Sequence, residues 1–190
     1  ITFISKNSLA TTAFYKILAG EIKPDSGIIE WGQTITASYL PNENESYFAS
    51  EPMNLIDWLR QYSSEKDESY IRGFLGKMLF SGDETFKLSN VLSGGEKVRC
   101  MLSRMMLTEA NVLMLDEPTN HLDLETITTL NNSLINFQGN VLFTSRDHTF
   151  TQTVANRVIE IGPKGFLDKL KTFDEYIDDK EVQNQRETIY

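Results

Sequence analysis

The chain has 190 residues, with 18 Lys and Arg against 27 Asp and Glu, which gives a formal net charge of −9. Hydrophobic residues make up 40% and charged residues 24% of the sequence, proportions typical of a folded globular domain rather than a disordered segment. The acidity excludes a broad basic surface for nucleic acid but leaves room for one local basic patch. The single cysteine, Cys100, excludes an internal disulfide framework and favours an intracellular setting.

No stretch approaches the roughly 18 uninterrupted apolar residues of a membrane span, so we expect no direct membrane insertion and a cytoplasmic location. The first residue is Ile1, and no basic segment followed by an apolar one resembles a secretion signal. Either the N-terminus is processed or the chain is a piece of a longer protein.

Hydrophobic spacing predicts the first elements of the chain. Ile1–Ile4 is expected to be a short buried strand, and Thr11–Leu18 has the apolar spacing of a helix. A turn at Pro24–Gly27 precedes two predicted strands, Ile28–Trp31 and Ile35–Leu40. The middle of the chain is predicted to be mostly helical, with helices at Met53–Tyr62, Glu68–Lys77 and Gly94–Leu107.

Strands and helices alternate in the last third of the chain. The expected strands are Val112–Leu115, Val141–Phe143 and Arg157–Ile161, with helices from Asp123 to Phe137 and at Thr149–Ala155. This alternation implies right-handed crossovers and an α/β fold with a mostly parallel sheet flanked by helices. The strongly charged residues Asp174–Tyr190 are expected to end in a solvated tail, and Trp31, Trp58 and Cys100 to lie in the core.

The segment Leu92–Glu96 reads Leu-Ser-Gly-Gly-Glu and opens a predicted helix. Two glycines let a ligand approach the backbone closely, and the free amides at a helix N-terminus favour an anion such as a phosphate. Taken alone, the pattern is equally compatible with a glycine-rich helix start that is capped by Ser93.

A second pattern lies at Val112–Asp123, where four apolar residues precede Asp116 and Glu117. In an open parallel sheet, ligands bind beyond the carboxyl ends of the strands, so a buried strand here would deliver both carboxylates to a ligand. Asp116 is a candidate ligand for Mg²⁺, directly or through water. Glu117 is a candidate base that polarises an attacking water. The alternative, a solvated strand end, is disfavoured by the neighbouring glycine motif.

These patterns resemble the motifs of the ATP-binding cassette (ABC) ATPases. Leu92–Glu96 matches the signature motif, Leu113–Glu117 the Walker B strand with the catalytic glutamate, and Asn120–Asp123 the D-loop. Pro118–Asp123, which reads Pro-Thr-Asn-His-Leu-Asp, resembles the ABC-F subfamily, whose members are cytosolic twin-cassette proteins that act on ribosomes. The chain looks like the C-terminal cassette. The resemblance implies a P-loop NTPase-like fold with an inserted helical subdomain, ATP and Mg²⁺ as cofactors, and ATP hydrolysis.

The phosphate loop departs from the family pattern of Gly, four residues, Gly-Lys and then Ser or Thr. Side chains replace the glycines, which disfavours left-handed backbone and close phosphate approach, and the lysine that reaches the phosphates is missing. We therefore expect weak or altered nucleotide binding, with Lys6 as another source of charge and Thr12 as the hydroxyl that binds Mg²⁺. The expected nucleotide contacts of the loop are Ser5, Asn7, Ser8, Ala10, Thr11 and Thr12.

Two further positions differ from the family pattern. Asn42 occupies the place of the Q-loop glutamine and is one methylene shorter, although it remains an expected nucleotide contact. Arg146 occupies the place of the switch histidine; it is permanently charged and cannot accept a proton, but it can contact a γ-phosphate. The resemblance thus implies Glu117 and Arg146 as the catalytic residues, and His148 is expected to be a surface residue.

In the family two cassettes meet head to tail, and each ATP lies between the phosphate loop and Walker B of one cassette and the signature of the other. The resemblance therefore implies an asymmetric role, with an intact signature donated outward and a compromised site at this chain's own loop. The residues expected to serve the partner's nucleotide or the interface are Ser93, Gly94, Gly95, Glu96 and Asp123.

The resemblance also divides the chain. Residues 1–50 and 107–172 are expected to form two parts of the ATPase core, 51–106 a helical signature subdomain that rotates on closure, and 173–190 a charged tail. The antiparallel strands that usually precede the phosphate loop are missing, so we expect a fragment with weak activity by itself.

Three functions remain open at this stage. The first is a cassette of an ABC-F-type ATPase that acts on the ribosome as a translation factor or in antibiotic resistance. The second is the ATP-binding subunit of a membrane transporter whose spans lie in another chain. The third is a regulatory pseudo-cassette with little hydrolysis, which the altered loop and Arg146 motivate.

Overall fold

The computed structural model describes all 190 residues. Six strands form one sheet in the order β2-β3-β4-β1-β5-β6. All neighbouring strands are parallel except β5 and β6, which form an antiparallel pair. The mostly parallel α/β fold predicted from the sequence is confirmed. The strands are β1 Thr2–Ile4, β2 Ala37–Leu40, β3 Val112–Asp116, β4 Asn140–Thr144, β5 Val158–Gly162 and β6 Gly165–Lys169.

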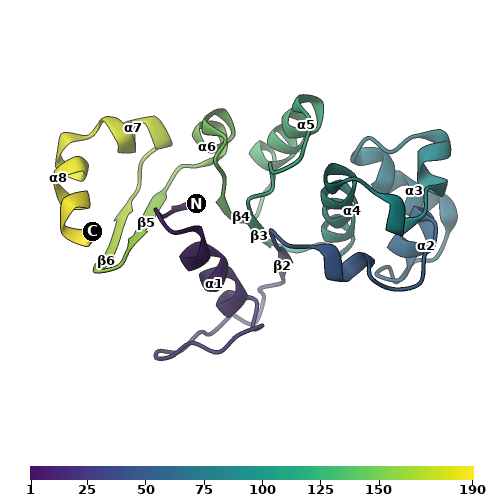
Figure 1. Ribbon diagram of the computed structural model, residues 1–190, viewed down its shortest axis with the longest axis horizontal. Helices are drawn as coiled ribbons and strands as arrows, with labels where there is room; N and C mark the ends of the chain where they lie inside the picture. Colours follow the sequence, from purple (N-terminus) through teal and green to yellow (C-terminus); the bar gives the residue numbers. More distant parts are fainter.

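Helices cover the sheet on both sides and extend it at both ends (Figure 1). Helices α5 and α6 lie on one side and α1 on the other, while α2, α3 and α4 gather at one end of the molecule and α7 and α8 at the other. The α-helices are α1 Ser8–Leu18, α2 Leu55–Arg60, α3 Glu68–Lys77, α4 Gly94–Leu107, α5 Leu124–Ile135, α6 His148–Val154, α7 Phe173–Asp178 and α8 Lys180–Ile189. Short 3-10 helices span Glu45–Phe48, Gly82–Phe86 and Ser89–Val91. None of the helices has the length and apolar character that a membrane span requires.

The sheet register brings three strand ends together. Asp116 at the end of β3 is directly opposite Thr144 at the end of β4, and β1 pairs with both β4 and β5. Because β1, β3 and β4 are parallel, their carboxyl ends meet at one edge of the sheet. The loop that follows β1 and the residues that follow β3 and β4 therefore lie around one place.

The largest core cluster joins the helical segment between β2 and β3 to the sheet. Helix α4 buries one face, since its apolar residues recur with helical spacing; the buried ones are Val98, Cys100, Met101, Leu102 and Met105. Trp58 of α2 is fully buried, stacks on Phe48 with ring centroids 4.7 Å apart, and donates from Nε1 to the Tyr47 carbonyl over 3.0 Å. The predicted core positions of Trp58 and Cys100 are confirmed.

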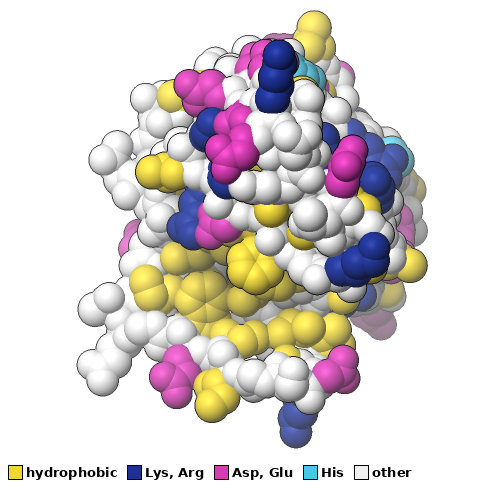
Figure 2. Space-filling view, turned by 90° about the vertical axis from the view of Figure 1, so that its left-hand side faces the viewer, with side chains coloured by type: hydrophobic (Ala, Val, Ile, Leu, Met, Phe, Trp, Pro, Cys, Tyr) yellow, Lys and Arg dark blue, Asp and Glu magenta, His cyan; other side chains and the backbone are white.

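The predicted strand at Ile28–Trp31 is wrong, because residues 19–36 form no strand. Strand β2 pairs only with β3, so these apolar residues have no strand to pair with. Ile28 is 87% exposed, and Trp31, expected in the core, is 42% exposed and donates from Nε1 to the Leu18 carbonyl over 3.3 Å. Figure 2 shows a band of hydrophobic side chains in the lower half of the molecule, seen from the end formed by β6 and α8.

The expected solvated tail is also wrong, because the charged C-terminal residues fold into α7 and α8 and pack on β5. Tyr176 and Val182 are buried. Glu160 of β5 is 1% exposed and accepts from the Tyr176 hydroxyl and from Arg186 Nε, each over 2.7 Å. Composition does not reveal this packing, because it depends on a few apolar residues of the segment, Tyr176 and Val182, and on the distant Glu160 that pairs with Arg186. His148, at the start of α6, is exposed as expected and lies 2.9 Å from an Asp174 carboxylate oxygen.

We predict that Trp58→Phe destabilises the protein by about 2 kcal/mol, because it leaves a small cavity and an unpaired buried carbonyl. The matched control is Trp31→Phe, at the second of the two tryptophans, which should change the free energy of unfolding by less than about 0.5 kcal/mol at an exposed position. Urea unfolding monitored by circular dichroism measures both. Equal effects of the two substitutions would contradict the packing described for Trp58.

Candidate functional site

Asp116 is held by two threonine hydroxyls at the edge of the sheet. Thr12 of α1 donates to Oδ2 over 2.7 Å, and Thr144 of β4 donates to Oδ1 over 3.0 Å. The side chain is 1% exposed. Burial raises the pKa of this carboxyl above its usual value, and the two hydroxyl hydrogen bonds oppose that rise. Asp116 is thus a buried, fixed oxygen donor.

Glu117 has a strained backbone and a free carboxylate oxygen. Its φ of +54° lies in the left-handed region, which costs a non-glycine residue about 1 kcal/mol or more. Its amide donates to the Thr144 hydroxyl over 3.0 Å, which fixes the turn. Oε2 is buried without a partner, and Oε1 lies 3.8 Å from Arg146 Nε. Burial raises the pKa of Glu117, and the nearby Arg146 charge opposes that rise. A buried carboxylate oxygen with a raised pKa and no hydrogen-bond partner is a candidate general base.

The phosphate loop is shorter than the sequence predicted. Helix α1 begins at Ser8 and not at Thr11, because Asn7 caps it by accepting from the Leu9 amide over 3.1 Å. The Ala10 amide donates to the Asn7 carbonyl over 3.0 Å. Amides that a P-loop offers to phosphate are therefore engaged within this chain.

The start of the loop is tied to β5 and to the C-terminal residue. The Ser5 hydroxyl donates to the Ile161 carbonyl over 2.8 Å and accepts from the Asn7 amide over 3.2 Å. The Lys6 amide donates to the Tyr190 hydroxyl over 3.2 Å, and the Lys6 ammonium lies 3.7 Å from the centre of the Tyr190 ring. The Lys6 ammonium of the loop is thus engaged in a cation–π contact with the Tyr190 ring.

A polar cavity of about 250 Å³ opens between the loop and the two strand ends. Its walls include two cations, one carboxylate and several hydroxyl groups, a composition suited to a phosphorylated ligand. The polar lining residues are Ser5, Lys6, Ser8, Thr11, Glu117, Thr144, Ser145 and Arg146. Thr12 and Asp116 lie beside it and present the oxygen donors that Mg²⁺ prefers, so the residues present fit this ion.

The signature residues lie on a second surface, apart from this cavity. Ser93 caps α4 by accepting from the Glu96 amide over 3.3 Å, and the Glu96 carboxylate accepts from the Ser93 amide over 2.8 Å. The Lys87 ammonium donates to the Glu96 carboxylate over 2.7 Å. Burial would raise the pKa of Glu96, but these hydrogen bonds outweigh it and lower the pKa to about 2.

The two signature glycines pack against His121 of the D-loop segment. A Cβ on Gly95 would lie 2.5 Å from the His121 carbonyl oxygen, and one on Gly94 would lie 3.3 Å from the His121 side chain. His121 has a φ of +64°. Gly95 is therefore required for this backbone contact, in addition to any role toward a ligand, whereas a Cβ on Gly94 would need only a small shift of the His121 side chain.

The remaining expected contacts do not line the polar cavity. Asn42 accepts from the Asn120 side chain over 3.2 Å. Asp123 accepts from the Thr126 amide over 2.8 Å and so serves as the N-cap of α5. The structure thus brings Ser5, Ser8, Thr11, Glu117 and Arg146 to one cavity, and separates them from Ser93–Glu96, Asn42 and Asp123.

Two site residues were missed by sequence reasoning. Thr144 hydrogen-bonds both the Asp116 carboxylate and the Glu117 amide. Its position directly before the switch segment is the sequence feature that could have identified it. Tyr190, the last residue, contacts the phosphate loop at Lys6. The two residues are 184 positions apart, and a local sequence pattern cannot predict a contact over that separation.

A family model described as ABC transporter matches residues 11–120. The chain therefore belongs to the ABC ATP-binding family, and it is an ABC ATPase domain. It is 56% identical over its whole length to the uncharacterized ABC transporter ATP-binding protein YkpA of Bacillus subtilis, of which it covers 35%. It is 29% identical to the energy-dependent translational throttle protein EttA of Haemophilus influenzae, over 87% of this chain and 30% of that protein.

Solved structures show the same fold. The archaeal ribosome recycling factor aABCE1, in a complex with the ribosomal stalk protein aP1, is 26% identical with a TM-score of 0.69 over 84% of this chain and 31% of that one. A dimeric ATP-binding cassette bound to ADP and phosphate has a TM-score of 0.66 at 15% identity, over 84% of this chain and 79% of that one. The chain spans 35% and 34% of the lengths of two curated relatives that it matches.

We predict that Asp116→Asn stabilises the Mg²⁺-free protein at pH 7, because burial raises the carboxyl pKa and its ionised form costs folding free energy. The folded protein binds more protons than the unfolded chain between the two pKa values, so stability of the unsubstituted protein falls as pH rises through that window. The gain from Asp116→Asn should therefore shrink toward pH 4.

Asp168→Asn is the matched control. The Arg157 guanidinium lowers the pKa of Asp168, so its removal should cost stability at pH 7 and cost less as pH falls. Thermal unfolding from pH 4 to pH 8 measures both variants. A loss of stability in Asp116→Asn at pH 7 would show that the two threonine hydrogen bonds outweigh burial.

Proposed function

We propose that the chain works as one cassette of a head-to-tail pair, in which it donates Ser93–Glu96 to a nucleotide held by the partner cassette. The observation that carries this proposal is the separation of the two sites. The signature glycines sit at a capped helix start held against His121, whereas the amides of the chain's own loop are already bonded. A helix start of this kind suits an anion.

At its own loop the chain's residues take distinct roles in this proposal. Thr12 and Asp116 hold Mg²⁺, which supplies charge neutralisation for the phosphates when it is bound. Glu117 orients and deprotonates a water through its unpartnered Oε2. Thr144 fixes the Asp116 carboxylate and the backbone of Glu117, and Arg146 provides positive charge toward a terminal phosphate in place of a histidine.

We infer that the parent protein is of the ABC-F type and acts on the ribosome in the cytoplasm, in translation or antibiotic resistance. Pro118–Asp123 supports this reading, as do relatives named Uup and EttA, the latter a translational throttle protein. The division into core segments 1–50 and 107–172 and a signature subdomain 51–106 forms part of the same proposal, whereas residues 173–190 fold into α7 and α8 instead of a tail.

A pseudo-cassette that pairs without hydrolysing at its own loop is the second candidate. The bonded amides of Lys6, Asn7, Leu9 and Ala10 favour it, because a phosphate would have to displace these partners. The transporter-subunit alternative rests on the family match, because the likeness to a solved ABC transporter, with a TM-score of 0.70 at 19% identity, shows the fold alone.

We predict weak nucleotide binding at the chain's own loop, with a dissociation constant well above the micromolar range. Titration of the Mg²⁺-loaded protein with a fluorescent ATP analogue measures it. Lys6→Ala and Thr12→Val should weaken the binding several-fold further, whereas Lys164→Ala, on the β5–β6 turn outside the cavity, should not. Micromolar binding that survives both loop substitutions would refute the altered-loop interpretation.

We predict that the full-length parent carrying Glu117→Gln, and the matching change in its other cassette, co-sediments with ribosomes when ATP is present. Blocking hydrolysis holds the cassettes closed and lengthens the bound state. Glu125→Gln, an exposed residue of α5, is the matched control and should leave binding transient. ATP binding without ribosome association would instead favour a transporter subunit.

A further inference from the structure

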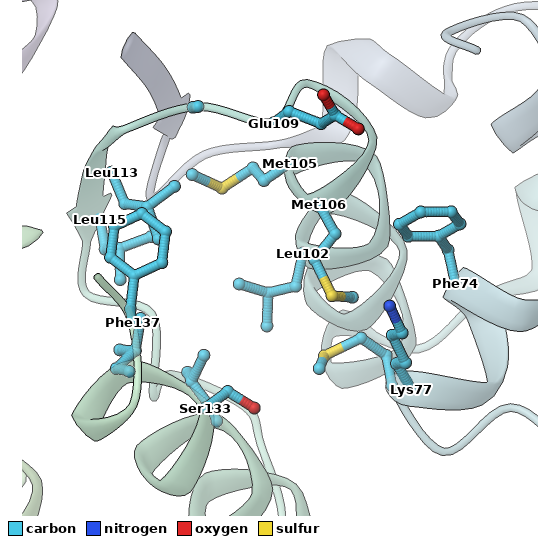
Figure 3. A pocket seen from close by; sticks show the side chains of 14 residues that line it. Phe74, Lys77, Leu102, Met105, Met106, Glu109, Leu113, Leu115, Ser133 and Phe137 are labelled. Carbon is cyan, nitrogen blue, oxygen red and sulfur yellow. The ribbon is translucent and has the colours of Figure 1, made fainter. Parts of the chain in front are cut away.

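An apolar cavity of about 300 Å³ lies on the seam between the helical segment and the sheet. Helices α3, α4 and α5 and strand β3 all contribute to its walls (Figure 3). Eleven of its 14 lining residues are hydrophobic. They include Phe74, Leu102, Met105, Leu113, Leu130 and Phe137.

The cavity opens to solvent where Lys77 and Ser133 are exposed, so it is a pocket that a ligand can enter rather than a void of the interior. Its lining is apolar, so water gains little from filling it, and an apolar cavity of about 150 Å³ already holds a benzene molecule. By comparison with that benzene-sized cavity, a volume of about 300 Å³ has space for a ligand of about ten carbon atoms. Three methionines, Met78, Met105 and Met106, line it, and their flexible side chains can adapt to a guest.

One cation stands at the wall of this cavity. The Lys77 ammonium lies 4.7 Å from the centre of the Phe74 ring and forms no salt bridge. The other charged lining residue is Glu109, and Figure 3 shows its carboxylate at the end of α4, directed away from the cavity. An apolar pocket with an exposed ammonium at its rim, in contact with an aromatic ring but with no carboxylate, suits an amphiphile with an anionic head.

We propose that this cavity is a binding site for a small aliphatic carboxylate of medium chain length, with its tail among the methionines and its head at Lys77. None of the cavity's lining residues lines the polar cavity at the phosphate loop. The two sites are therefore separate, and this proposal does not depend on the function proposed above.

A ligand in this cavity would lie between helix α4 and strand β3. Leu102, Met105 and Met106 belong to α4, which begins with the signature, and Leu113 and Leu115 belong to β3, which ends at Asp116. A bound chain fills the space between these two elements and holds them at a fixed separation.

The test uses the full-length protein and decanoate as the probe, with calorimetry and thermal unfolding as the readouts. Ser133 faces the cavity from α5, and its hydroxyl bonds only to the carbonyl one turn earlier. Ser133→Phe should fill the cavity, weaken decanoate binding at least tenfold, and abolish the rise in melting temperature caused by decanoate. The matched control is Asn132→Phe, at the exposed residue directly before Ser133 in the same helix. Asn132 does not line the cavity, so this substitution should leave binding unchanged.

Comparison with decanol tests the head group. Decanoate should bind several-fold more tightly than decanol, Lys77→Met should remove that difference, and Lys77→Arg should retain it. Equal loss in Ser133→Phe and Asn132→Phe, or no saturable binding of either probe below its aggregation concentration, would overturn the site. Equal binding of both probes to the unsubstituted protein would overturn the assignment of an anionic ligand.

Discussion

The hydrogen bonds that Thr144 makes to the end of β3 hold the site together. Its hydroxyl donates to Asp116 and accepts from the Glu117 amide, so one side chain fixes one carboxylate and the strained turn that carries the other. The register of β3 against β4 places Thr144 opposite Asp116. Thr12 then joins α1 to the same carboxylate. A parallel sheet with buried strands is what allows these three elements to meet without water.

Around this point the molecule divides its polar groups between two surfaces. The amides of the chain's own loop are bonded to Asn7, Ser5 and Tyr190, while the signature helix begins at a capping box against His121. The alteration of the phosphate loop is therefore more than a loss of one lysine. An asparagine cap occupies the place where an anion would find its donors, which is a local device that asparagine supplies in many helices.

The sequence predicts those features that depend only on residues close together in the chain. The apolar run before Asp116, the glycines after Ser93 and the strands at β1, β3, β4 and β5 follow from spacing, and the sheet contains these strands. The antiparallel strand β6, Gly165–Lys169, is not among the predicted strands. Sequence reasoning fails where distant residues decide the outcome. In the charged C-terminal segment, Tyr176 and Val182 pack on Val158 of β5, and the buried Glu160 is satisfied by Tyr176 and Arg186. Residues 19–36 stay irregular because β2 pairs only with β3 and offers them no strand to pair with.

The contact between Gly95 and the His121 carbonyl has a consequence for communication between paired sites. His121 lies four residues after Glu117, and both have left-handed backbones. The segment between them is a hydrogen-bonded turn, in which the Asn120 amide donates to the Glu117 carbonyl over 3.1 Å. Five backbone residues, from Glu117 to His121, and one close contact therefore connect the end of β3 to the start of α4. In the proposed pairing of cassettes, this short backbone connection joins the chain's own polar cavity to the surface that donates Ser93–Glu96.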